Sequence, residues 1–234
     1  MSKHDLKLII QRMKLYSENS VEPEENSIRK ASVAAIIRWR PYLDFPLVDS
    51  QIKNPLDLLI QPWVNDCHGE AEILYIQRAL RPNDKSISWS GHIAFPGGKD
   101  EPSDKTSLDT VIRECREEIG IDLSTDGFLL LGTLEKRKIN QANMLKMILT
   151  PYVTPITPAC TIQMSEVADL HWIPILPYTP IKEEDPTGKS PWSVHTIVPA
   201  IPIADVYLWG MTLRMTQDIL QLPISPYTLS TSHL

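Results

Sequence analysis

Three glutamates lie within little more than one helical turn of the sequence: Glu114, Glu117 and Glu118. At about 100° per residue in a helix, their side chains fall within an arc of about 100°. Like charges at these spacings repel one another, at roughly a few tenths of a kcal/mol per pair in water and more when partly buried. A divalent cation removes that cost, and carboxylate oxygens suit the hard ions Mg²⁺ and Mn²⁺. The spacing therefore predicts a metal site.

A second interpretation of the same acids is a solvated, charged helix face, which is common for such clusters when they stand alone. Here the acids follow a glycine pair, Gly97 and Gly98, that lets the backbone turn tightly against a ligand. Divalent ions commonly bridge protein carboxylates to phosphate oxygens, and a helix N-terminus favours anions. The combination favours a metal-dependent site for a phosphate-containing ligand.

The helix that must position these acids is expected over residues 104–119. Asp104 can cap its start, and Gly120 supplies its stop. Arg113 stands beside Glu117, where it can pair with a carboxylate. The arc next to the acids must face a core, which places the acids at the border of a cleft; the members of this arc are Leu108, Val111, Ile112, Cys115 and Ile119.

Strands and further helices are expected around this helix. Apolar runs predict strands at 32–38 and 71–79, before the glycine pair. Residues 177–191 are expected to form a loop, and 211–222 a closing amphipathic helix. Further strand candidates lie at 127–138, 145–156, 165–175 and, as a hairpin, 193–210. This order of elements predicts an α/β fold with a mixed sheet and helices on its faces.

The composition limits the class of protein. Of 234 residues, 42% are hydrophobic and 22% charged, as in an ordinary globular chain. The formal net charge of −6 argues against non-specific binding to nucleic acid, which needs a basic surface. No apolar run approaches the roughly 18 residues of a membrane span, so no membrane partner is expected. Three widely spaced cysteines without a C-x-x-C pair argue against a zinc site and indicate a reducing compartment.

The segment Gly98–Ile121 resembles the box of the Nudix hydrolases. The pattern of that box is Gly, five residues, Glu, seven residues, then Arg-Glu-apolar-x-Glu-Glu-x-Gly-apolar. Asp104 stands where the first Glu is expected, and eight residues separate it from the arginine. This insertion, with "FPGG" before it, resembles the coenzyme A diphosphatase branch. The second half of the box is matched in order by Arg113, Glu114, Cys115, Glu117, Glu118, Gly120 and Ile121.

The resemblance to this branch covers the chain from about Ala71 to about Gln221. It implies an α/β/α sandwich around a mixed β-sheet. The stretches that are similar to the branch, besides the box itself, are 74–99, 146–156, 165–175 and 207–220.

The resemblance also implies roles for the residues of the box. Glu114, Glu117 and Glu118 would bind Mg²⁺ or Mn²⁺, and Arg113 would orient a neighbouring carboxylate. A carboxylate that is not fully committed to metal can serve as the general base, and Glu117 is the first candidate.

A base from a later loop is the alternative, with Glu135 and Glu166 as candidates. Glu166 is equally well explained as a structural acid at the start of a strand. Three aromatic residues near the box are interpreted as packing residues rather than as residues that stack on substrate: Trp89, His92 and Trp209.

The substrate side of the site involves the turn and basic residues. Gly97 and Gly98 are candidate substrate-binding residues, and the resemblance assigns Gly98 to the turn that brings the backbone to metal or phosphate. Lys99 can contact a phosphate, although a lysine beside a turn is more often solvated. Arg78 and Arg81 can hold the 3′-phosphate or the diphosphate of a coenzyme A-like substrate by bidentate pairing, with plain surface charge as the alternative.

The resemblance implies hydrolysis of a nucleoside diphosphate linked to another group. The expected substrate is coenzyme A or acyl-coenzyme A, giving 4′-phosphopantetheine and adenosine 3′,5′-bisphosphate. The alternatives are another nucleotide (ADP-ribose, a dinucleotide or an oxidised nucleotide) or a non-catalytic Nudix-fold binding module. Such modules usually lose box carboxylates, and all three helical glutamates are present here, which favours the enzyme. A phosphoinositide-type diphosphatase would need many basic residues lining a cleft, and the net negative charge of this chain gives that alternative little support.

The N-terminal region carries an apolar stripe on a predicted helix at residues 3–16. A presequence, a membrane-surface helix and a helix docked on the domain all show such a stripe. Asp5 and the shortage of serines favour the docked helix. We therefore expect a helical extension at 1–30, a Nudix hydrolase domain at 31–225 and a tail at 226–234. The stripe consists of Leu6, Ile9, Ile10 and Met13.

The last three residues, Ser232, His233 and Leu234, resemble the peroxisomal address, for which Ser-Lys-Leu is the pattern. The protein is therefore expected in the peroxisome, with the import receptor as a partner, and otherwise in the cytoplasm. Residues 1–70 are expected either to cover the sheet or to form the surface of a homodimer.

Overall fold

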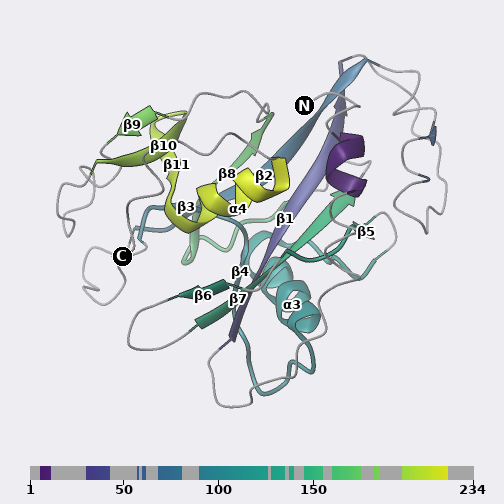
Figure 1. Ribbon diagram of the computed structural model, residues 1–234. Coiled ribbons are helices and arrows are strands. Elements are labelled where there is room, and N and C mark those ends of the chain that lie inside the picture. The colour runs from purple at the N-terminus through teal and green to yellow at the C-terminus, as the bar shows by residue number, and fades with distance from the viewer. Residues whose placement is uncertain are drawn as a thin grey trace.

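The computed structural model of the chain has a central sheet with helices on both sides (Figure 1). Of the residues discussed above, Met13, Arg81, Trp89, Glu135 and the C-terminal tripeptide lie outside the described residues. The structure describes residues 6–11, 30–42, 57, 60–61, 68–80, 90–125, 128–134, 137–139, 145–154, 160–174, 182–184 and 197–220.

The central sheet is mixed. Its strands are β1 (Lys30–Pro41), β2 (Gly69–Arg78), β3 (Ile93–Ala94), β4 (Gly97–Lys99), β5 (Leu129–Leu130), β6 (Arg137–Ile139), β7 (Leu145–Thr154) and β8 (Val167–Ile173). The strand order is β3-β2-β1-β7-β5, with β4 paired to β1, β6 to β7 and β8 to β2. β1 and β7 run parallel, whereas the other pairings of this sheet are antiparallel.

β1 occupies the middle of the sheet because its sequence is apolar on both faces. Ala34 and Ile36 are buried on one face, and Ala35 and Ile37 on the other. Such continuous apolar runs are typical of strands that are covered on both sides. β1 and β2 overlap the strands predicted at 32–38 and 71–79.

One face of the sheet is covered by the helix that carries the acids, α3 (Ser107–Ile119). Val111, Cys115 and Ile119 are fully buried against β1 and β2, and Leu108 and Ile112 pack at the margin of the same cluster. The predicted core-facing arc of this helix is thus confirmed.

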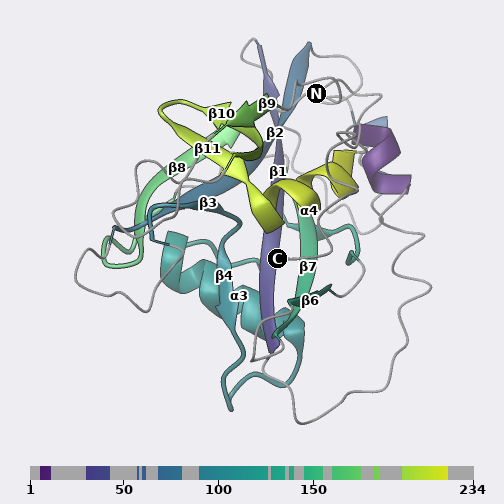
Figure 2. The ribbon, with the colours of Figure 1, turned by 60° about the vertical axis from the view of Figure 1, so that its left-hand side comes forward.

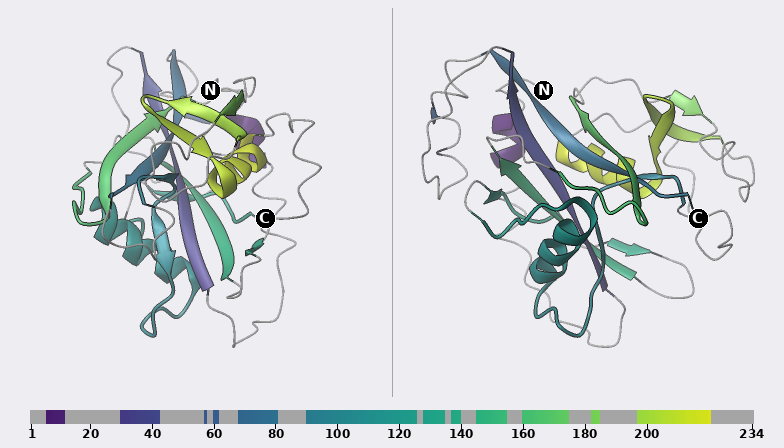
Figure 3. Two further views of the ribbon diagram at one scale, coloured as in Figure 1. Left: turned by 90° about the vertical axis from the view of Figure 1, so that its left-hand side faces the viewer. Right: turned by 180° about the vertical axis from the view of Figure 1, so that it is seen from behind.

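The opposite face is covered by α4 (Gly210–Leu220) and by the helical residues 6–11. Figure 3, on its left, shows the sheet between the teal α3 and the yellow α4, so the predicted α/β/α sandwich is confirmed. Within the described ranges, no helix is both long and apolar enough to cross a membrane. Both N-terminal and C-terminal helical segments contribute to one buried cluster, as expected for a docked N-terminal helix: Leu6, Ile9, Ile10, Leu213 and Ile219.

A second, antiparallel sheet contains β9 (Lys182–Glu184), β10 (Val198–Ile203) and β11 (Val206–Trp209). β10 and β11 form the predicted hairpin, and β11 leads directly into α4 (Figure 2). β9 corrects the expectation of loop over 177–191. Its sequence Lys-Glu-Glu has no apolar alternation, and backbone pairing with β10 makes it a strand.

Candidate active site

α3 begins with a capping box. Thr106 Oγ1 accepts a hydrogen bond from Asp109 N (3.2 Å), and Asp109 Oδ2 accepts one from Thr106 N (2.8 Å). The expectation that Asp104 caps the helix is therefore wrong, because the helix starts after Thr106. The Thr-x-x-Asp spacing is the signal that could have located this start. Gly120 ends the helix in the left-handed conformation, as predicted.

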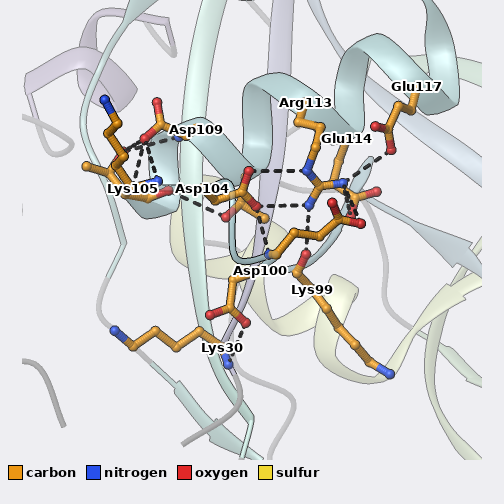
Figure 4. Close-up of polar contacts among 12 residues, drawn as sticks. Lys30, Lys99, Asp100, Asp104, Lys105, Asp109, Arg113, Glu114 and Glu117 are labelled. Carbon is orange, nitrogen blue, oxygen red and sulfur yellow. Dashed lines mark hydrogen bonds and ion pairs between the residues drawn. The ribbon is translucent and has the colours of Figure 1, made fainter. Parts of the chain in front are cut away.

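Arg113 is the centre of a network of ion pairs (Figure 4). Its Nη2 donates to Asp104 Oδ2 (3.0 Å) and to the backbone carbonyl of Lys99 (2.9 Å). Its Nη1 donates to Glu114 Oε1 (3.1 Å) and Glu117 Oε2 (3.2 Å). The hydrogen bond with Asp104 is the main cause that raises the pKa of Arg113, so the guanidinium stays charged. Arg113 therefore ties the loop before α3 to two of the predicted metal ligands.

Asp104 serves as the partner of Arg113. Its side chain is 5% exposed, and its Oδ2 also accepts a hydrogen bond from Glu101 N (2.9 Å). The hydrogen bond from Arg113 is the largest effect on the pKa of Asp104, which lies below its ordinary value. Asp104 is consequently an ionised structural acid at the site, directed at the arginine.

Glu118 is the most buried of the helical acids, with 2% of its surface exposed. Its Oε2 accepts a hydrogen bond from Gly97 N (2.8 Å), and its Oε1 lies 3.9 Å from Nη1 of Arg78. Burial, reinforced by the charges of Glu114 and Glu166, raises the pKa of Glu118 to about 7, against the opposing effects of Gly97 and Arg78. A cation at this position would relieve the cost of ionising Glu118.

Glu114 is partly buried, and its carboxylate lies against Gly98. A Cβ added at Gly98 would stand 2.3 Å from Glu114 Oε1, so a larger residue leaves this carboxylate no room. Burial is the largest effect that raises the pKa of Glu114, and the charges of Glu117 and Glu166 add to it, while Arg113 lowers it.

Gly97 is required for a different reason. Its φ is +140°, and a Cβ there would lie 2.2 Å from the carbonyl oxygen of Ser32 in β1. Gly97 is paired with Val33 in the ladder between β4 and β1. The first glycine of the pair thus allows the close approach of two backbones, and Gly98 makes space for an acid.

Two of the predicted base candidates lie within the described residues. The side chain of Glu117 is 57% exposed. Glu166 precedes β8, and its carbonyl accepts a hydrogen bond from Ala79 N (2.8 Å), just after β2. The negative charge of Glu166 is the smallest of the effects that raise the pKa of Glu114 and Glu118. The fold therefore brings Glu166 to the helical acids from another element.

The predicted substrate residues adjoin the acids to different degrees. Arg78 ends β2 next to Glu118, and the glycine turn touches both buried acids. Lys99 contributes its carbonyl to Arg113, and its side chain extends away from the acids in Figure 4. Arg81 lies outside the described residues.

Residues 62–190, more than half of the chain, match the NUDIX domain. The chain belongs to the Nudix family. An uncharacterized protein of Schizosaccharomyces pombe is 35% identical over 153 residues, which cover 63% of this chain and 42% of that protein. The uncharacterized Nudix hydrolase NudL of Yersinia pestis is 38% identical over 58 residues, which cover 25% of this chain and 27% of NudL. The matched segments thus span less than half the length of these relatives.

Two solved structures are similar to this Nudix chain. The NUDIX domain of Shewanella oneidensis NrtR, complexed with ADP ribose, is 19% identical, with 69% of this chain and 82% of that chain covered and a TM-score of 0.40. The Nudix hydrolase RenU from M. smegmatis is 13% identical, with 89% and 95% covered and a TM-score of 0.44.

The departure of this chain from the first half of the Nudix box has a structural explanation. Asp104 is shorter than the expected glutamate and stands one residue further from Arg113. It reaches the guanidinium from the loop before α3 with both carboxylate oxygens, at 3.2 Å to Nε and 3.0 Å to Nη2. With this spacing, Asp104 and Arg113 form a bidentate ion pair.

Nudix hydrolases generally use divalent metal ions. Among the described residues, no three His, Cys, Asp or Glu side chains are gathered closely enough to hold a metal as they are placed. As placed, Glu117 accepts a hydrogen bond from Arg113, and one oxygen of Glu118 accepts a hydrogen bond from Gly97 N. The carboxylates of Glu114, Glu117 and Glu118 still fit a hard cation, because such ions prefer oxygen ligands. The raised pKa of the buried Glu118 also indicates a position where a positive charge would be favourable. Glu114, Glu117 and Glu118 are the residues of α3 that would hold such an ion.

His92, a residue outside the predicted set of site residues, lies next to Arg78. His92 contributes the carbonyl that accepts a hydrogen bond from Arg78 N (2.9 Å). The ring of His92 meets that of Trp209 edge to face, with centroids 4.9 Å apart. Nothing in the local sequence signals this contact, because Trp209 comes from the second sheet, far along the chain.

Proposed function

We propose that this Nudix protein hydrolyses the diphosphate of coenzyme A or acyl-coenzyme A. Water adds to one phosphorus, and the bridging oxygen leaves with the other. The products are 4′-phosphopantetheine, or its acyl form, and adenosine 3′,5′-bisphosphate. The observation that carries the proposal is a buried glutamate among further carboxylates, set against a glycine turn with Arg78 at its edge. The likeness of "FPGG" and of the box insertion to the coenzyme A diphosphatase branch supports the choice of substrate.

The helical acids would form the metal site of this reaction. Glu114, Glu117 and Glu118 would hold Mg²⁺ or Mn²⁺. When bound, the ion neutralises diphosphate oxygens and makes the attacking water more acidic. Glu117 would take the remaining proton of that water because it is the exposed acid, and Glu166 is the alternative base from the other side of the acids.

Basic and backbone groups would position the substrate. Arg78, with 33% of its side chain exposed, would donate hydrogen bonds to phosphate oxygens next to Glu118. Arg113 would orient Glu114 without touching the substrate. Lys99 and Arg81 are proposed as additional phosphate contacts.

The direct test is an assay of the purified full chain with Mg²⁺ or Mn²⁺ and coenzyme A, with both products identified by mass. ADP-ribose, a dinucleotide and an oxidised nucleotide are run alongside, and faster turnover of any of these would assign a different substrate class. Absence of turnover with all of them would make the protein a binding module.

Two variants separate the candidate bases in the same assay. Glu117→Gln should lower kcat about 100-fold or more if Glu117 is the base, because a positioned base typically contributes that much. Unchanged hydrolysis by this variant would exclude an essential role for Glu117. A larger loss with Glu166→Gln would assign the base to Glu166 instead.

We also propose that the protein enters the peroxisome through Ser232, His233 and Leu234. A fluorescent protein fused in front of the chain tests this in cells with labelled peroxisomes. The fusion should be peroxisomal, and deletion of Leu234 should leave it in the cytoplasm. A cytoplasmic signal from both fusions would exclude the proposed address.

A further inference from the structure

A bulge in the chain places His92 across from Arg78. Arg78 N donates to the carbonyl of His92 (2.9 Å), and Gly91 N donates to the carbonyl of Arg78 (3.1 Å). Gly91 and His92 therefore both lie opposite the single residue Arg78. Gly91 has a φ of +77°, which is the left-handed conformation of the first residue in a glycine-type β-bulge. Bulges of this kind re-aim side chains and are frequent next to active sites. This one begins where β2 ends beside Glu118.

Trp209 extends the surface next to His92 from the second sheet. The two ring planes are inclined by 62°, with the centroids 4.9 Å apart. Both His92 and Trp209 are partly exposed. Burial, with the charge of Arg78 as a second cause, lowers the pKa of His92, so its ring is neutral at neutral pH. His92 and Trp209 therefore present an uncharged aromatic surface.

We infer that His92 and Trp209 bind the adenine ring of the substrate. The inference rests on the proposed function, since it takes the substrate to be a nucleotide. Arg78 lies beside Glu118 and its backbone N–H donates to the carbonyl of His92, so the aromatic pair adjoins the residue proposed to bind the phosphates. Aromatic side chains bind bases by stacking, because every base has a π-face. The two residues then determine specificity in addition to packing.

The alternative occupant of this surface is the pantetheine half of coenzyme A. Pantetheine is a flexible amide chain without a planar ring, so it gains nothing from a stacking surface. An acyl chain would need a larger apolar surface than one indole and one imidazole provide. The chemistry of the pair thus favours adenine, and the pantetheine half is assigned to another direction from the acids.

Two replacements of Trp209 separate stacking from packing. Trp209→Leu and Trp209→Phe both keep an apolar side chain, and only phenylalanine keeps a ring. Calorimetric titration of the full chain with Mg²⁺ measures the binding of adenosine 3′,5′-bisphosphate and of 4′-phosphopantetheine. Trp209→Leu should weaken binding of the bisphosphate about five- to 100-fold and change that of 4′-phosphopantetheine less than about twofold. Trp209→Phe should retain most of the affinity.

Further variants provide the controls. His92→Ala should act in the same sense as Trp209→Leu, and it carries the test should the leucine variant fail to fold. Tyr42→Ala removes a 59% exposed aromatic residue just after β1, away from the site. This variant should bind both ligands with unchanged affinity. Thermal unfolding of each variant establishes that it is folded.

The outcomes distinguish this inference from the proposed function. Two results in folded Trp209→Leu would overturn the adenine subsite. One is weaker binding of 4′-phosphopantetheine with binding of the bisphosphate unchanged, and the other is unchanged binding of both ligands. If coenzyme A is hydrolysed and neither Trp209→Leu nor His92→Ala raises KM, the proposed function is retained and the adenine subsite is wrong. If coenzyme A is not hydrolysed but AMP binds and Trp209→Leu weakens it, the subsite stands and the proposed function is wrong.

Discussion

Three chemically identical side chains stand in three different environments within one turn of α3. Glu118 is buried and bonded to Gly97, Glu114 lies partly buried against the glycine turn, and Glu117 is more than half exposed. The free energy of an ionised carboxylate depends on burial and on neighbouring charge, so the three acids differ in their affinity for protons and cations. Glu118 is fixed in place, whereas Glu117 is free to exchange Arg113 for a ligand.

The two glycines of the turn should respond differently to the same replacement. Gly98→Ala places a methyl group against Glu114 Oε1 and should lower kcat about 10- to 100-fold, because small displacements of catalytic groups are costly. Gly97→Ala meets the backbone of β1 at a φ of +140° and should lower the free energy of unfolding by about 1–3 kcal/mol. Activity assays and urea unfolding measure the two effects. A fully active Gly98→Ala chain would contradict the proposed position of Glu114.

Glu118 should make the metal-free protein less stable as the pH rises. Its pKa of about 7 in the folded chain lies above its ordinary value of 4.5, so the folded state binds the proton more tightly. The resulting stabilisation is present below about pH 4.5 and is lost as the pH rises through 7, by up to about 3 kcal/mol.

Urea unfolding in EDTA between pH 5 and 8 measures this dependence. Glu118→Gln, which keeps an acceptor for Gly97 N, should remove most of it and be the more stable chain at pH 8. Mg²⁺ should reduce the difference between wild type and variant. Identical pH profiles of the two chains would show that Glu118 ionises without penalty.

At the scale of elements, α3 is specified by its own sequence. Its apolar stripe and the glycine after it predict a helix over 104–119, and the structure has Ser107–Ile119. The start differs because Thr106 and Asp109 form the capping box, a local signal that the prediction missed, while Asp104 pairs with Arg113. β1 and β2 were predictable from apolar runs, whereas β9 was not, because only its partner strand makes it regular.

The capping box should contribute measurably to stability. Thr106→Ala should lower the free energy of unfolding by about 1 kcal/mol, since a backbone N–H of the first turn loses its acceptor. Asp109→Ala should cost a similar amount, and the double variant less than the sum, because both residues belong to one reciprocal pair. Denaturant unfolding provides the three values. Strictly additive costs would mean that the two side chains act independently.

At the scale of the whole molecule, the site forms where four elements meet. β4 supplies the glycine turn, α3 the helical acids, the end of β2 Arg78, and the segment before β8 Glu166. The pairing of β4 with β1, and of β8 with β2, brings these elements together. The box residues were predictable because they are close in sequence. The contacts of Arg78 with Glu118, and of His92 with Trp209, depend on the register of the sheets and on the second sheet.

The most direct test of the account is Mn²⁺ binding, because the repelling carboxylates of α3 are held to share a divalent cation. Titration of the full chain, followed by the electron paramagnetic resonance of free Mn²⁺, needs no substrate. The wild type should bind Mn²⁺, and Gln at position 114, 117 or 118 should weaken it about ten-fold or more. Asp169→Asn, a change of the same charge at a 62% exposed side chain in β8, should have little effect. A wild-type chain that binds no Mn²⁺, or whose affinity is unchanged by all three substitutions, would contradict the account.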